Sequence, residues 1–173
     1  YNPNAFNIRN DSTGNVSITS IEIDVSTAML PDLVYDPAGV AGDTDAKCFQ
    51  ADTGAVETGL VAPANPCVSP FSVPHDDGYD RLAVSFIDFD PGETFGFSID
   101  ADPTSIRGTG GQGSASPGSV SGVELTGATV TVHFDDGSVI SGEPFRTSGS
   151  QAGSQNVIKA GPPAAPTIAA LGV

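Results

Sequence analysis

The sequence predicts an all-β protein, an antiparallel β-sandwich of immunoglobulin-like or jelly-roll type with a long loop-rich insertion at about residues 27–80. Three observations support this class. Apolar and polar residues alternate in several short segments, 21 Gly and 14 Pro residues separate them, and no segment carries a sustained helical stripe. A chain of 173 residues can bury a substantial core in one unit. We therefore expect a single sandwich domain over residues 1–160.

The clearest strand pattern lies in segment 81–102. Two half-buried strands are predicted there from alternating apolar positions: Leu82, Val84 and Phe86 before a Pro91-Gly92 turn, and Phe95, Phe97 and Ile99 after it. The two strands form either a β-hairpin or a β-arch. Acidic residues crowd their ends, so this segment should combine a hydrophobic inner face with an acidic rim.

Segment 4–25 predicts two adjacent antiparallel strands. Phe6 and Ile8 alternate with polar residues, a turn covers 11–15, and a second alternating run ends at Val25. The alternation slips by one position between Ile18 and Ile21. This slip indicates a β-bulge near residues 19–20.

Three strands are predicted in the C-terminal half: Val120 to Leu125, Ala128 to Phe134 and Val139 to Phe145. Asp136-Gly137 suits a primed hairpin turn between the last two. The Gly/Ser-rich segment 103–119 is expected to be a flexible connection. Residues 161–173 read as a Pro-rich linker that leads into a following segment, or alternatively as a last strand from Ile168 to Val173.

The insertion carries one expected short strand, Leu33 to Tyr35, and both cysteines of the chain. A disulfide between Cys48 and Cys67 would close a loop of about 20 residues and stabilise the fold by about 3 kcal/mol. Two unpaired thiols are the alternative. Zinc is disfavoured, because neither a CxxC spacing nor a neighbouring His is present.

The chain is strongly acidic, with 21 Asp and Glu residues against 6 Lys and Arg, a net charge of −15. Binding to nucleic acid is therefore disfavoured electrostatically. Two interpretations of the excess negative charge are open. It keeps the protein soluble in a salty or extracellular medium, or some of the carboxylates converge on Ca²⁺, which prefers hard oxygen ligands.

Three acidic segments are candidate calcium sites. The first is the loop HDDGYD, with ligands Asp76, Asp77 and Asp80, and the second pairs carboxylates at i, i+2 spacing, Asp88 with Asp90 and Asp100 with Asp102. The third is a loop with Asp43 and Asp45. The spacing of an EF-hand is absent, and solvated acidic turns are the alternative for each segment.

Catalytic constellations are poorly represented. Only His75 and His133 are available, His133 falls on the polar face of a strand, and no GxSxG elbow occurs. Abundant carboxylates alone cannot argue for a glycosidase, and the chain lacks Trp, whose face commonly stacks on sugar rings. Tyr79 and Tyr35, together with His75, are the candidate contacts for a glycan. Alternatively, both tyrosines anchor loops to the sandwich.

Two sequence signatures resemble the bacterial immunoglobulin-like modules related to the CARDB group. Asn10, Gly14, Ile21 and Ile23 match the opening signature, and Pro91-Gly92-Glu93 matches a later turn before an aromatic-rich strand. The long insertion between the signatures departs from that family. The resemblance implies a non-catalytic part of a larger secreted or cell-surface protein.

Together these features predict a non-catalytic accessory module of a secreted or cell-surface multidomain bacterial protein. We expect it to bind a neutral polysaccharide or other glycan and to be stabilised by Ca²⁺. The alternative is a structural spacer or adhesin-type repeat without its own ligand. We expect neighbouring domains linked covalently in a longer chain, and neither nucleic acid binding nor membrane insertion.

Overall fold

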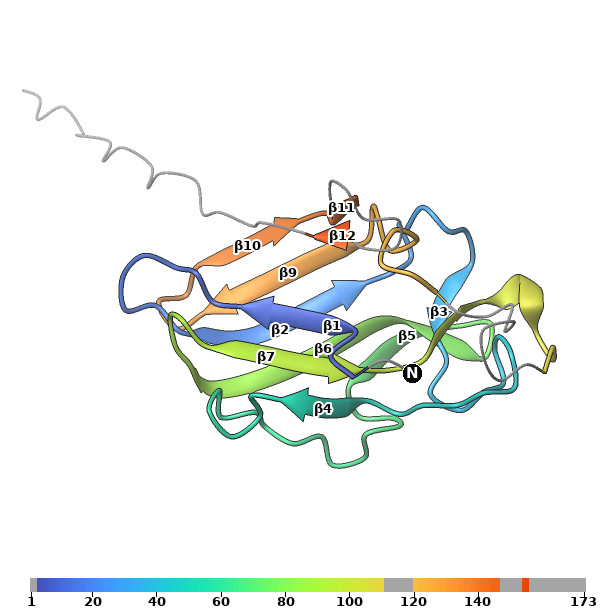
Figure 1. Ribbon diagram of the computed structural model, residues 1–173, viewed down its shortest axis with the longest axis horizontal. Coiled ribbons are helices and arrows are strands. Elements are labelled where there is room, and N and C mark those ends of the chain that lie inside the picture. The colour runs from blue at the N-terminus through green and yellow to red at the C-terminus, as the bar shows by residue number, and fades with distance from the viewer. Residues whose placement is uncertain (1–2, 111–119, 147–153, 156–173) are drawn as a thin grey trace, which may run out of the picture.

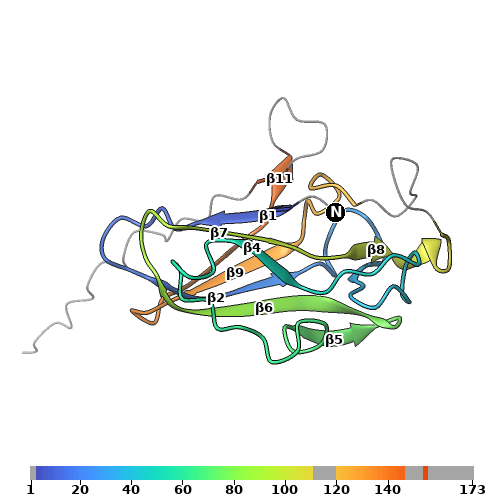
Figure 2. The same ribbon diagram turned by 60° about the horizontal axis from the view of Figure 1, so that its bottom comes forward.

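The computed structural model describes residues 3–110, 120–146 and 154–155 and confirms the predicted all-β class. The described residues form antiparallel strands and one short 3-10 turn, η1 (Thr104–Ile106). Two main sheets lie face to face as the layers of a sandwich (Figure 1 and Figure 2). A separate two-stranded pairing joins β11 (Phe145–Arg146) and β12 (Ser154–Gln155).

The smaller layer has three strands, in the order β1 (Phe6–Arg9), β7 (Thr94–Ser98) and β4 (Gln50–Thr53). The strands of the larger layer follow one another in the order β10 (Val139–Gly142), β9 (Thr129–Phe134), β2 (Ile18–Asp24), β6 (Gly78–Phe89), β3 (Leu33–Tyr35) and β8 (Ala101–Pro103). In addition, β5 (Phe71–His75) pairs with β6. The long strand β6 is therefore the organising element of this layer.

The segment with the clearest sequence pattern forms a β-arch. Strands β6 and β7 follow one another through the Pro91-Gly92 turn, but they belong to different layers. Phe86 of β6 meets Phe95 of β7 across the core with ring centroids 5.1 Å apart. Because both strands turn their alternate apolar residues inward, this one segment supplies much of the contact between the layers.

The N-terminal strands are not adjacent, so the prediction of two neighbouring strands in segment 4–25 was wrong. Strand β1 pairs with β7, with Phe6 opposite Phe97, whereas β2 lies between β6 and β9. The connection between β1 and β2 crosses from one layer to the other. The predicted bulge is confirmed, because both ladders of β2 shift register between Ile18 and Ser20.

The C-terminal half agrees with the prediction only in its hairpin. Strands β9 and β10 pair through a turn in which Gly137 has a positive φ of 82°. The strand expected from Val120 to Leu125 is absent, because residues 121–126 form successive turns closed by local backbone hydrogen bonds. The predicted linker or last strand in 161–173, and most of the Gly/Ser connection, lie outside the described residues.

The insertion region contains the expected strand β3 and two further strands, β4 and β5, before β6 begins. The disulfide between Cys48 and Cys67 is present. Beside it, the Phe49 N–H donates to the Pro66 carbonyl at 3.1 Å. The disulfide therefore ties the segment that leads into β4 to the segment that leads into β5.

Replacing both cysteines by Ser should lower the free energy of unfolding by about 3 kcal/mol, because the cross-link joins residues 19 apart and restricts the unfolded chain. For a chain of this size the melting temperature should fall by about 6 to 12 °C. Urea denaturation of the double variant, compared with the oxidised wild type, measures this loss. An unchanged denaturation midpoint would contradict a stabilising role.

Candidate cation site

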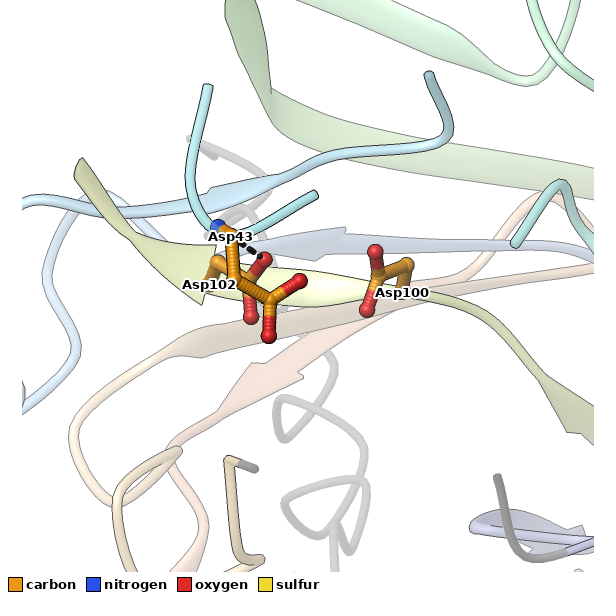
Figure 3. A group of neighbouring side chains, drawn as sticks. All are labelled: Asp43, Asp100 and Asp102. Carbon is orange, nitrogen blue, oxygen red and sulfur yellow. Dashed lines mark hydrogen bonds between the residues drawn. The ribbon is translucent and has the colours of Figure 1, made fainter. Parts of the chain in front are cut away.

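Three buried carboxylates converge at one end of the sandwich. Asp43, Asp100 and Asp102 each place a carboxylate oxygen within 4.8 Å of the oxygens of the other two. Figure 3 shows Asp43 and Asp102 side by side and the carboxylate of Asp100 directed towards them. Their exposed fractions are 3%, 5% and 1%. The cluster is thus a group of oxygens enclosed by protein rather than an acidic patch on the surface.

Two of the three carboxylates share one face of a strand segment. Asp100 directly precedes β8 and Asp102 lies within it, and side chains two positions apart in extended chain point the same way. Strand β3 fixes this segment, since Val34 pairs with Asp102. The backbone of Asp100 is also fixed on both sides: its carbonyl accepts from the Asp36 N–H and its N–H donates to Lys47, both at 3.1 Å.

The third carboxylate comes from the loop between β3 and β4, which Asp36 organises. The buried Asp36 carboxylate accepts hydrogen bonds from the N–H groups of Val40, Ala41 and Gly42 at 2.8–3.0 Å. The next N–H, that of Asp43, donates to Asp102 Oδ2 at 3.0 Å. This sequence of bonds turns the loop so that the Asp43 side chain enters the cluster.

Gly42 allows this close approach. A Cβ atom at position 42 would lie 2.1 Å from the Cβ atom of Asp102, a distance that no packed side chains adopt. The loop is held from the other side by Gly108, whose N–H donates to the Gly42 carbonyl at 2.8 Å. Gly42 therefore has no side chain that would clash with Asp102, and Asp43, the next residue, contributes its carboxylate to the cluster.

The cluster is electrostatically strained unless its negative charge is compensated. Burial is the main cause that raises the pKa of Asp102 to about 7; the hydrogen bond from the Asp43 N–H acts against it, and the charges of Asp43, Asp36 and Asp45 add to it. A carboxyl group in such a place is either protonated or, when it is ionised, needs a cation or other partners that compensate its charge. The spacing suits a cation, because two oxygens each about 2.3–2.6 Å from one Ca²⁺ lie at most about 5 Å apart. The cluster could hold a metal ion.

The first predicted calcium loop, His75 to Asp80, instead covers the end of β5, the tight turn at residues 76–77 and the start of β6, and its carboxylates have other partners. Asp80 contacts His75 Nδ1 at 2.8 Å, and Asp77 forms an ion pair with Arg107 at 2.7 Å. The Asp76 carbonyl accepts from the same guanidinium. Asp76, Asp77 and Asp80 therefore do not converge on a common point: Asp76 and Asp77 connect the hairpin tip to Arg107 after η1, whereas Asp80 contacts His75 of the same hairpin.

His75 should titrate above its ordinary pKa of 6.5, because the hydrogen bond to Asp80 and the charges of Asp80, Asp76 and Asp32 favour its protonated form. Its contribution to stability is complete below pH 6.5 and is lost as pH rises through the raised pKa. An NMR titration in which Asp80→Asn lowers the His75 pKa, with His133→Gln to assign the resonance, measures this. A His75 pKa that is insensitive to Asp80→Asn would contradict the pairing.

The second predicted site is divided between the two ends of the sandwich. Asp88 and Asp90 are exposed near the β6–β7 turn, where Asp90 accepts from Ser17 Oγ, so they do not join Asp100 and Asp102. The candidate site instead combines half of the second predicted segment with Asp43 of the third. Among the described residues this is the one group of three or more such ligands with suitable spacing.

The predicted glycan contacts are not assembled at the surface. Tyr35 has an exposed fraction of 0% and packs against Phe71, with ring centroids 5.9 Å apart. Tyr79 is half-buried, and its ring stacks on Phe71 with ring centroids 5.4 Å apart. The burial of Tyr35, in a strand whose three residues are all buried, counts against the predicted role of its side chain as a ligand contact.

Tyr35→Phe should raise the free energy of unfolding by about 1 kcal/mol, because the buried Tyr35 hydroxyl has no hydrogen-bond partner among the described residues. Burial, with a smaller effect of Asp24, raises the pKa of this hydroxyl, so it stays protonated. Chemical denaturation measures the change. A loss of more than about 1 kcal/mol would indicate that the hydroxyl contributes a stabilising contact.

Comparison with known proteins adds no relative. No family model matches the chain, and neither a curated protein nor a solved structure matches it. In the part of the chain that the structure describes, no helix has the length and apolar character needed to cross a membrane.

Proposed function

We propose that the chain is a non-catalytic extracellular module that binds Ca²⁺ at Asp43, Asp100 and Asp102 and uses the ion to hold its loops in place. The observation that carries this proposal is the burial of three carboxylates whose oxygens lie within 4.8 Å of one another. Ca²⁺ suits the group better than Mg²⁺, because Ca²⁺ accepts six to eight oxygens in flexible geometry and Mg²⁺ retains its waters.

The position of the cluster supports a structural role for the ion. Asp43 belongs to the β3–β4 loop, whereas Asp100 and Asp102 belong to the segment that leaves β7 and forms β8. A cation between them would connect two segments that are far apart in sequence and would neutralise their mutual repulsion. The Cys48–Cys67 disulfide fits an oxidising extracellular compartment. A spacer or adhesin-type repeat in a longer protein is the role that these features favour.

Glycan binding has weaker support. Of the three expected contacts, Tyr35 is fully buried and the Tyr79 ring is partly covered by Phe71, which leaves His75 at the hairpin tip. Affinity electrophoresis in gels that contain neutral polysaccharides, with and without Ca²⁺, tests this role separately. Retardation by one polysaccharide would favour the binding module over the spacer.

The melting temperature in EDTA and in Ca²⁺ tests the proposal. A ligand that binds only the folded state at about 100 times its Kd stabilises it by about 2.7 kcal/mol. For a chain of this size the melting temperature should rise by about 5 to 10 °C. Mg²⁺ at the same concentration and NaCl at matched ionic strength are the controls, because a net charge of −15 is also relieved by general screening. An equal rise with NaCl would contradict a specific site.

A further inference from the structure

Two Asn-x-Ser sequences stand in the connection between β1 and β2. They are Asn10-Asp11-Ser12 and Asn15-Val16-Ser17, and neither has proline at its middle position. This tripeptide is the acceptor for N-linked glycans in secreted proteins, where the modified asparagine must lie at the surface. The Cys48–Cys67 disulfide is compatible with the kind of oxidising compartment in which this modification occurs.

Asn10 is unsuitable as a glycan carrier because the fold uses the atom to which the sugar would be attached. Its side-chain nitrogen donates to the Phe89 carbonyl at 2.9 Å and to the Val16 carbonyl at 3.0 Å, and the residue is 2% exposed. Its side-chain oxygen accepts from the N–H and the hydroxyl of Ser12. A sugar on this nitrogen would break both donated bonds and would not fit in the buried site.

Asn15 has the opposite environment. It lies in an exposed stretch with Thr13 and Gly14. The sequence on its C-terminal side is anchored, because the Ser17 N–H donates to Asp135 Oδ1 at 3.1 Å and the Ser17 carbonyl accepts from the Asp135 N–H at 3.0 Å. The loop is at the end of the sandwich away from β3, which Figure 1 labels, and away from β8, which Figure 2 labels. A glycan there would leave the cation site uncovered.

We propose that Asn15 is an N-glycosylation site and that Asn10 is not. In the transfer, the Asn15 amide nitrogen attacks the anomeric carbon of an oligosaccharide linked to a lipid diphosphate. The new C–N bond forms as the C–O bond to the diphosphate breaks, the amide loses a proton to a base, and the lipid diphosphate leaves. Where transfer precedes folding, a sugar on Asn10 prevents the native hydrogen bonds, so the folded, secreted protein carries none at that residue.

Secretion of the full chain from a eukaryotic cell that contains an oligosaccharyltransferase tests the proposal. The secreted wild type should carry one glycan, and its removal by peptide-N-glycosidase in heavy-oxygen water should convert Asn15, and not Asn10, into a labelled aspartate. Asn15→Gln should abolish the shift in electrophoretic mobility, and Ser12→Ala, which removes only the first acceptor sequence, should retain it in full.

Peptide mapping of the wild type requires no substitution, so misfolding of a variant cannot affect which asparagine is found to carry the glycan. A labelled aspartate at position 10 in the folded protein would overturn the assignment, as would a secreted wild type without any glycan. Neither outcome bears on the calcium site, whose test uses the unglycosylated chain as well.

Discussion

Asp102→Asn is expected to change stability in opposite directions with and without Ca²⁺. In EDTA at pH 8 the variant should be more stable than the wild type, because it no longer buries an ionised carboxylate beside Asp43 and Asp100. A pKa of about 7, against the ordinary 3.8, corresponds to a cost on the order of 4 kcal/mol for the ionised form. The asparagine oxygen can still accept from the Asp43 N–H, so the loop keeps this bond.

In saturating Ca²⁺ the order should reverse, because the variant lacks a ligand charge and loses most of the stabilisation of about 2.7 kcal/mol that the bound ion supplies at 100 times its Kd. Urea denaturation in both buffers measures the four free energies. Asp88→Asn is the matched control, since it removes an exposed carboxylate at the other end and should respond to Ca²⁺ as the wild type does. A variant that is less stable than the wild type in EDTA would show that the carboxylate is compensated within the protein itself.

Phe95→Ala should lower the free energy of unfolding by about 3–5 kcal/mol, because it leaves a cavity between the two layers. The Phe95 ring is fully buried and contacts Phe86 of the facing sheet and Phe97 of its own strand, with centroids 5.1 and 5.8 Å apart. Ile87→Ala removes another large apolar side chain, but one that is 78% exposed, and should change stability by less than about 0.5 kcal/mol.

Equilibrium urea denaturation compares the two variants. If Phe95→Ala leaves too little folded protein to measure, Phe95→Leu should show a smaller loss in the same direction. Equal effects of the Phe95 and Ile87 substitutions would contradict the two-layer packing. Because Phe95 belongs to the hydrophobic core and not to the carboxylate cluster, the response of Phe95→Leu to Ca²⁺ should equal that of the wild type.

Strand positions were predictable where one face is buried, since a period of two then marks the inward residues. This holds for β6 and β7 and for the bulge at residues 19–20. Pairing was not predictable in the same way. The connection after β1 covers residues 10–17, and only long-range contacts show that it joins different layers. The apolar run in 120–125 fails as a strand because local turns satisfy its backbone.

The candidate site shows the same limit. That Asp100 and Asp102 share a face follows from their i, i+2 spacing in extended chain. Their third partner does not follow from spacing, because Asp43 reaches them through a loop folded by the Asp36 carboxylate and by a hydrogen bond between residues 59 apart in sequence. Sequence alone could find acidic segments but could not decide which of them meet.

Calorimetric titration of Ca²⁺ into the chelator-stripped chain tests the calcium site most directly. We predict one bound ion per chain for the wild type and for Asp88→Asn, and loss of this binding for Asp43→Asn. Absence of binding to the wild type, or binding that persists in Asp43→Asn, would contradict the assignment of the buried carboxylates as the ion's ligands.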